Sequence, residues 1–134
     1  MESKVIDLSE VQTEHIDDLL ETYDAEFIGE VQSGDVNIGI VVNGELVAGA
    51  VASLTTFNIL YVSTTYVNEA FRGRGLGRQL MEAVEDRGRA LGAQYIRLDT
   101  FDWQGVKFYR ALGFEEVGSY EADGFSEHFF LKRL

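Results

Sequence analysis

The chain has 134 residues, of which 46% are hydrophobic, and this length and composition suit one domain with a single core. Its 23 acidic and 11 basic residues give a net charge of -12, which argues against a nucleic-acid partner because phosphate contacts need a basic surface. The absence of cysteine excludes a disulfide framework, a thiolate zinc site and a cysteine nucleophile.

The same sequence sets expectations about location and metal binding. No apolar run approaches the ~18 residues that a membrane span needs, and the N-terminus lacks a signal-peptide pattern, so we expect a cytoplasmic protein with no membrane partner. His15 and His128 stand far apart without partners at ligand spacing, so we expect no metal site and treat both as structural or exposed. The acidic composition has three open explanations: a solvated surface, a cationic substrate or a halophilic source.

The first third of the chain predicts a strand, a helix and a hairpin. Residues 4–8 alternate like a short strand, and Ser9 or Thr13 then caps a helix that ends before Gly29.

The hairpin prediction rests on Asn43-Gly44, a dipeptide typical of tight turns between antiparallel strands. Residues 36–42 and 45–54 are the two strands on either side of it. A third strand, about 59–67, follows them.

The second half of the chain predicts alternating helices and strands. A helix over about 76–91 ends before Gly92, and residues 95–100 return as a strand parallel to the preceding one through a right-handed crossover. Then follow a short helix over 103–112, closed by Gly113, and a final hairpin of residues 115–120 and 128–133. The expected fold class is α/β, a mixed sheet that is antiparallel first and then contains one βαβ unit, in a single domain over residues 1–134.

A glycine-rich segment, Phe-Arg-Gly-Arg-Gly-Leu-Gly-Arg over residues 71–78, joins the third strand to the long helix. Glycine there permits a positive φ and the close approach of a bulky anion, while the first N–H groups of the helix have no intrahelical partners. Three of the 11 basic residues lie in this segment of a strongly acidic chain. We therefore expect a pyrophosphate site, because helix N-termini and arginines both favour phosphate.

The spacing matches neither the dinucleotide fingerprint, because Arg78 stands where a third glycine belongs, nor the P-loop, because no Gly-Lys-Ser/Thr follows. Arg72-x-x-Gly75-x-Gly77 instead resembles the signature of the GNAT superfamily of acyl-CoA-dependent N-acetyltransferases. The segment 98–114, which contains Phe-Tyr-x-x-x-Gly-Phe, resembles the second signature of that superfamily, and the element order resembles it over essentially the whole chain. The resemblance implies a mixed, mostly antiparallel sheet with a central splayed pair of parallel strands flanked by helices.

The resemblance also implies a co-substrate, acetyl-CoA, and the residues that bind it. The strand before the glycine segment bulges and splays from its parallel neighbour, so that its backbone holds the pantetheine arm while the glycine segment holds the pyrophosphate. Gln104 stands where many relatives carry asparagine. The cofactor-binding residues implied are Tyr66, Val67, Arg72, Gly73, Arg74, Gly75, Leu76, Gly77, Arg78 and Gln104.

Tyr109 is the catalytic residue that the resemblance implies, as a general acid beside the cofactor sulfur. Reference pKa values of ~10 for tyrosine and ~8.5 for a thiol make proton donation to a leaving thiolate only slightly uphill. The alternative is a packed tyrosine with a purely structural role. The group that takes the proton of the amine is not assigned, and the candidates are Asp99, Asp102, Glu26 and Glu69.

The expected function is direct acetyl transfer from acetyl-CoA to a primary amine of a small molecule or a protein, without a covalent enzyme intermediate. Two alternatives stay open: a non-catalytic acyl-CoA-binding module that regulates a partner, and a nucleotide-binding regulator that uses the same glycine segment. The final strands could pair across a homodimer, as in relatives.

Overall fold

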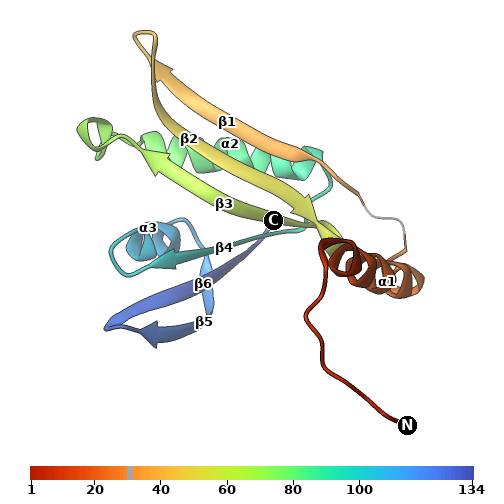
Figure 1. Ribbon diagram of the computed structural model, residues 1–134. Coiled ribbons are helices and arrows are strands. Elements are labelled where there is room, and N and C mark those ends of the chain that lie inside the picture. The colour runs from red at the N-terminus through yellow and green to blue at the C-terminus, as the bar shows by residue number, and fades with distance from the viewer. Residues whose placement is uncertain (30–31) are drawn as a thin grey trace. The chain divides into compact units, whose positions relative to one another are not determined.

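The structure, a computed structural model, describes residues 1–29 and 32–134, and it divides into two units, Met1–Val31 and Gln32–Leu134 (Figure 1). The expectation of one domain over residues 1–134 stays a prediction. Among the described residues, none of the helices combines the length and the apolar character that a membrane crossing requires.

In the first unit, residues 1–29 are described, and they form α1 (Glu10–Ile28) preceded by residues without regular structure. Ser9 caps it: its hydroxyl accepts from the backbone N–H of Gln12, and the Gln12 side chain accepts from the N–H of Ser9. The predicted cap and the end before Gly29 are confirmed. The strand expected over residues 4–8 is wrong, because an alternating pattern forms a strand only beside a partner, and residues 1–29, the described part of this unit, contain no strand.

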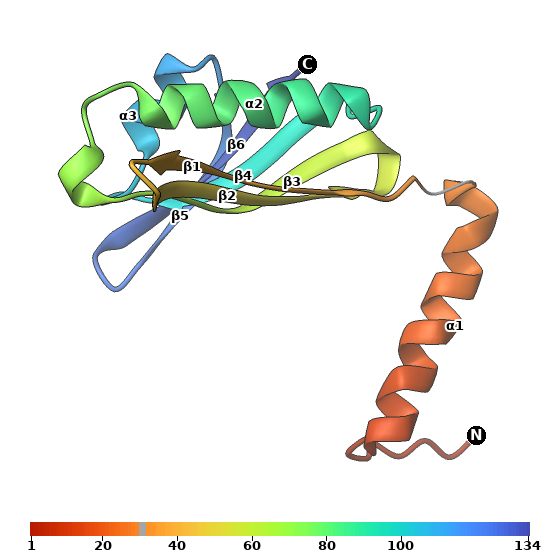
Figure 2. The same ribbon diagram turned by 90° about the horizontal axis from the view of Figure 1, so that it is seen from above.

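The second unit is a six-stranded sheet in the order β1-β2-β3-β4-β6-β5, with α2 lying along one face (Figure 2). Only the β3–β4 pair is parallel, so the sheet is mostly antiparallel as the resemblance implied. Its elements are β1 (Asp35–Val42), β2 (Glu45–Thr55), η1 (Thr56–Asn58), β3 (Ile59–Val67), η2 (Glu69–Phe71), α2 (Leu76–Ala90), β4 (Tyr95–Phe101), α3 (Val106–Ala111), β5 (Glu115–Ala122) and β6 (Phe125–Arg133).

The core forms where α2 meets the sheet. Leu80, Met81 and Val84 recur at helical spacing on one face of α2, and each is at most 1% exposed. They belong to the same buried cluster as strand residues such as Leu60, Ile96 and Phe130, and as Tyr109 of α3. The amphipathic pattern therefore anchors α2, whose first residues, from Leu76, belong to the glycine segment.

Two predicted boundaries change. The short helix expected from residue 103 begins only at Val106, because residues 102–105 form a turn. The final hairpin is longer than expected, with Asp123-Gly124 as its turn; both residues have positive φ values, 53° and 80°.

Candidate active site

The parallel strands β3 and β4 are paired only over Ile59–Tyr61 and Tyr95–Arg97. Beyond this short pairing β3 continues beside β2 and β4 continues beside β6, so the two strands diverge (Figure 1). The β2–β3 register shifts where Val51 pairs with Thr64 and Ala52 with Val62, which makes Ser63 the extra residue of a β-bulge. A bulge bends and twists its strand, and this explains why β3 leaves β4 there.

A cavity of about 780 Å³ lies beside the diverging strands. It is lined by β3 from Val62 onward, the glycine segment, β4 near Asp99 and the beginning of α3. Of the residues predicted to bind the cofactor, all except Arg74 line this cavity, and so does Tyr109. The lining residues predicted from the sequence are Tyr66, Val67, Arg72, Gly73, Gly75, Leu76, Gly77, Arg78, Gln104 and Tyr109.

The glycine segment has the backbone geometry of an anion site. Gly73 and Gly75 have φ values of 76° and 81°, and apart from the adjacent residues no heavy atom lies within 4 Å of the position where a Cβ would stand on either. α2 begins at Leu76, and Gln79 N donates to Gly75 O at 3.0 Å as the helix opens. The N–H groups that precede Gln79 at the helix start therefore have no intrahelical acceptor, and they are available to donate to an oxyanion ligand.

The three arginines of this segment differ in placement. Arg72 Nε donates to Val67 O at 2.8 Å, and its guanidinium lies 5.7 Å from the centre of the Tyr66 ring. Arg74 lies over Phe71, 5.3 Å from the ring centre, and does not line the cavity. Arg72 thus connects the glycine segment to the end of β3. Arg78 also lines the cavity and takes part in none of the contacts just described.

Tyr109 is 8% exposed, and its ring packs over Gly105, where a Cβ would stand 2.7 Å from the ring atom Cε2. Burial raises the pKa of the Tyr109 phenol, and the Thr65 hydroxyl acts in the opposite direction. The phenol is therefore protonated near neutral pH and available as a donor. Phe114 and Phe130 pack against the same ring, with centres 5.6 Å and 6.2 Å away.

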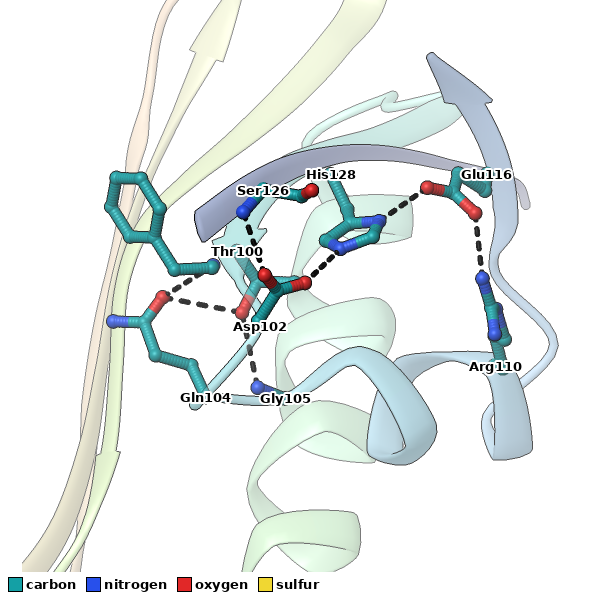
Figure 3. A network of polar contacts seen from close by, with 9 residues as sticks. Thr100, Asp102, Gln104, Gly105, Arg110, Glu116, Ser126 and His128 are labelled. Atoms are coloured by element: carbon teal, nitrogen blue, oxygen red, sulfur yellow. Dashed lines mark hydrogen bonds and ion pairs between the residues drawn. The ribbon is translucent and has the colours of Figure 1, made fainter. Parts of the chain in front are cut away.

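The turn between β4 and α3 is held by Thr100, which is 3% exposed (Figure 3). Its hydroxyl donates to Gln104 Oε1 at 3.3 Å and accepts from Gly105 N at 3.1 Å, while Phe101 N donates to Gln104 Oε1 at 2.8 Å. The carboxamide oxygen of Gln104 is thus engaged in the turn. Neither Thr100 nor Gly105 was predicted as a site residue; the available signal in the sequence was the four-residue spacing of Thr100 and Gln104.

Among the carboxylates of residues 32–134, Asp99 is the one that lines the cavity. Tyr61 donates its phenolic O–H to Asp99 Oδ1 at 3.3 Å. Burial, followed by the Asp99 carboxylate, raises the pKa of Tyr61. Of the other candidates for proton acceptor, Glu69 lies outside the lining, and the Asp102 carboxylate accepts from Ser126 N at 2.6 Å.

Comparison with known proteins agrees with this geometry. An acetyltransferase of Agrobacterium fabrum is 31% identical over 114 residues, which cover 84% of this chain and 83% of that protein. The crystal structure of an acetyltransferase from Bacillus cereus superposes with a TM-score of 0.90 at 27% identity, covering 98% of each chain. An acetyltransferase of Bacillus anthracis, solved in complex with acetyl coenzyme A, shares the fold at a TM-score of 0.69 and 16% identity, over 81% of this chain and 66% of that one.

The sequence profile of the acetyltransferase (GNAT) family matches residues 5–114, a span that includes the glycine segment, both diverging strands and α3. The resemblance drawn from the two motifs is thereby confirmed, and the chain belongs to the GNAT family of acetyltransferases.

Proposed function

We propose that this chain transfers the acetyl group of acetyl-CoA directly to a primary amine. The observation that carries the proposal is the divergence of β3 and β4 beside a cavity that reaches the glycine segment. When bound, acetyl-CoA supplies an acyl group activated as a thioester. The other steps belong to the side chains and backbone groups that line the cavity.

The cavity has the size and the polar groups that acetyl-CoA needs. Its volume of about 780 Å³ lies within the roughly 300–1,000 Å³ of typical ligand sites. The N–H groups at the start of α2 and the guanidinium of Arg78 would hold the pyrophosphate. The helix dipole alone contributes about 0.3–1 kcal/mol to an anion at such an end, so most of the affinity must come from combined hydrogen bonds. The Bacillus anthracis protein that shares this fold was solved with acetyl coenzyme A, which supports acetyl-CoA as the co-substrate.

Beyond Tyr61, the edge of β3 opposite β2 would pair with the pantetheine amides. Asn68 N donates to Val47 O of β2 at 2.7 Å, and successive backbone groups of a strand point to opposite edges. The N–H of Val67 therefore points to the open edge, whereas its carbonyl already accepts from Arg72. Among the backbone groups of β3 expected to bind the pantetheine arm, the Val67 N–H is the donor whose direction follows from these contacts.

Tyr109 and Asp99 are the side chains to which we assign proton transfer. The Tyr109 phenol would donate to the departing sulfur, since burial keeps it protonated. An amine with a lysine-like pKa of ~10.4 is neutral in only about four molecules in ten thousand near pH 7, so a base must receive its proton. Asp99 lines the same cavity and takes this role in our proposal. The net charge of -12 favours a cationic acceptor whose identity is unassigned.

Thermal unfolding with acetyl-CoA, coenzyme A, ATP and NAD tests the cofactor. Acetyl-CoA at 100 times its dissociation constant adds about 2.7 kcal/mol of stability, a shift of several degrees for a chain of this size. A selective shift supports the proposal, and an equal shift with ATP favours the nucleotide-binding regulator.

Thiol release from acetyl-CoA in the presence of an amine panel then tests catalysis. We expect the Tyr109→Phe variant to bind acetyl-CoA normally and to lose roughly 10²-fold or more in kcat, as loss of a general acid does. Binding without thiol release from any amine would favour the non-catalytic acyl-CoA-binding module.

A further inference from the structure

His128 of β6 lies between two carboxylates that come from distant parts of the chain (Figure 3). Its Nε2 is 2.7 Å from Asp102 Oδ1, and its Nδ1 is 2.5 Å from Glu116 Oε1. Asp102 belongs to the turn after β4, whereas Glu116 belongs to β5. The His128 side chain is 15% exposed, so these contacts are partly sheltered from water.

The two contacts determine the protonation state of the ring. An ionised carboxylate can only accept hydrogen bonds, and a neutral imidazole carries a single N–H. Both ring nitrogens are at hydrogen-bond distance from carboxylate oxygens, so when both carboxylates are ionised both contacts are satisfied only by an imidazolium, which donates from each nitrogen. The hydrogen bonds to Asp102 and then to Glu116 accordingly raise the pKa of His128.

The same two carboxylates connect His128 to both sides of α3. Before the helix, Asp102 accepts from Ser126 N through Oδ2 at 2.6 Å, and its own N–H donates to Ser126 O at 3.2 Å. At the other side, Arg110 of α3 donates to Glu116 Oε2 at 2.6 Å. The result is an alternating series of charges, Asp102, His128, Glu116 and Arg110, that spans the helix (Figure 3).

α3 depends on such support because it is short. It has 6 residues and no side-chain hydrogen bond at its N-cap, Gly105. A helix this short is not stable alone, so tertiary contacts must fix its position. Tyr109 lies within it and lines the cavity, which means that any movement of α3 moves the phenol.

We propose that His128 is a positioning residue for acetyl transfer: its charged ring bridges Asp102 and Glu116 and thereby holds α3 and the Tyr109 phenol in place. This inference rests on the function proposed above. The groups that face His128 are Asp102 from the turn, Glu116 from β5 with Arg110 behind it, and Thr100, its register partner on β4.

The pH dependence follows from the sign of the pKa shift. A histidine whose pKa is raised by folding keeps its bridging contacts below that pKa and loses them as the pH rises through it. Above it, one carboxylate faces a lone pair instead of an N–H. We therefore expect the kcat of the wild-type enzyme to decrease on the alkaline side of its pH profile, as His128 loses its proton.

The first experiment tests the contacts of the charged His128 ring with Asp102 and Glu116, and it does not require turnover. An NMR titration of both histidine rings in the wild-type chain should place the pKa of His128 above ~6.5, the ordinary value for histidine. In the Asp102→Asn and Glu116→Gln variants the pKa of His128 should fall. An ordinary pKa for His128 in the wild-type chain overturns the proposal even if acetyl transfer is never detected.

The second experiment uses kcat and KM with an amine accepted in the panel. We expect His128→Gln to lower kcat about ten-fold with the KM for acetyl-CoA within two-fold, less than the ~10²-fold attributed to a 1 Å misplacement. His128→Arg keeps a permanent charge and two donors, so it should restore kcat and remove the alkaline decline. His15→Gln is the matched control and should leave the profile unchanged.

These results separate the two proposals. A folded His128→Gln variant with unchanged kcat and an unchanged pH profile refutes the positioning role while acetyl transfer stands. Equal losses in His128→Gln and His128→Arg also refute it, because the charge would then be irrelevant. Complete absence of turnover in the wild-type enzyme contradicts the proposed function, and the NMR titration still decides whether the bridge exists.

Discussion

Replacing Gly105 with alanine should displace the Tyr109 ring. The backbone at Gly105 has φ -120° and ψ 21°, which alanine tolerates without a left-handed conformation. The new Cβ would nevertheless lie 2.7 Å from Cε2 and 3.1 Å from Cδ2 of the ring. The ring cannot simply retreat, because Phe114 and Phe130 pack against it.

The cost of this overpacking is about 1–3 kcal/mol. At about 2.1 cal/mol/K per residue, the 134 residues give an unfolding entropy of roughly 0.28 kcal/mol/K. Each kcal/mol therefore lowers Tm by about 3.6 °C, and we expect a decrease of about 4–11 °C. The displaced phenol should also lower kcat by about ten-fold or more while the KM for acetyl-CoA changes little.

Differential scanning calorimetry and thiol-release kinetics measure the two effects. Gly118→Ala is the matched control, since its nearest neighbour to a new Cβ is a Phe129 ring atom at 4.0 Å. It should raise Tm by about 1–4 °C and leave kcat unchanged, because a glycine replaced by alanine without strain gains about 0.4–1 kcal/mol. If Gly105→Ala unfolds at the temperature of this control and keeps full kcat, the packing of Tyr109 over Gly105 does not position the phenol.

Three further predictions concern other parts of the site and the fold. Gly75→Ala and Gly44→Ala both place alanine at φ 81° and should each lose about 1–2 kcal/mol in urea unfolding, but only Gly75→Ala should weaken acetyl-CoA binding in calorimetric titration. Lys132→Met removes an ammonium 2.5 Å from Glu85 Oε1, and it should lose about 1–3 kcal/mol in urea unfolding, because a partly buried carboxylate is left without its donor; an unchanged midpoint contradicts this. Hydrogen bonds to His128 lower the pKa of the Asp102 and Glu116 carboxylates. The stability that these carboxylates contribute is therefore present above their unfolded pKa values and is lost as the pH falls through their folded pKa values. Urea midpoints should consequently fall less steeply between pH 5 and 3 in His128→Gln than in the wild-type chain.

The parts of the fold that the sequence predicted well are those governed by local chemistry. Asn43-Gly44 gave both hairpin strands within about one residue, because positive φ values there, 50° and 81°, are properties of those two residues. The helix expected over about 76–91, with its end before Gly92, spans Leu76–Ala90. The divergence of β3 and β4 was predicted from the family resemblance alone, since the bulge at Ser63 leaves no periodic signal.

The parts that were missed depend on residues distant in sequence. The late start of α3 follows from the turn in which Asp102 contacts Ser126, 24 positions away. His128 was expected to be structural or exposed, and its contacts with Asp102 and Glu116 lie 26 and 12 positions away. Spacing rules that test neighbours within a few residues cannot detect such contacts. Arg72 was assigned to the anion from its place in a motif, whereas in the structure its Nε donates to Val67 O.

The short pairing of β3 with β4 has a mechanical consequence. Because the parallel ladder ends at Tyr61 and Arg97, the sheet consists of two antiparallel halves, β1-β2-β3 and β4-β6-β5, hinged along one brief seam. A ligand wedged between the halves would limit their relative rotation. Its occupancy should then slow amide hydrogen exchange at seam residues that it never touches.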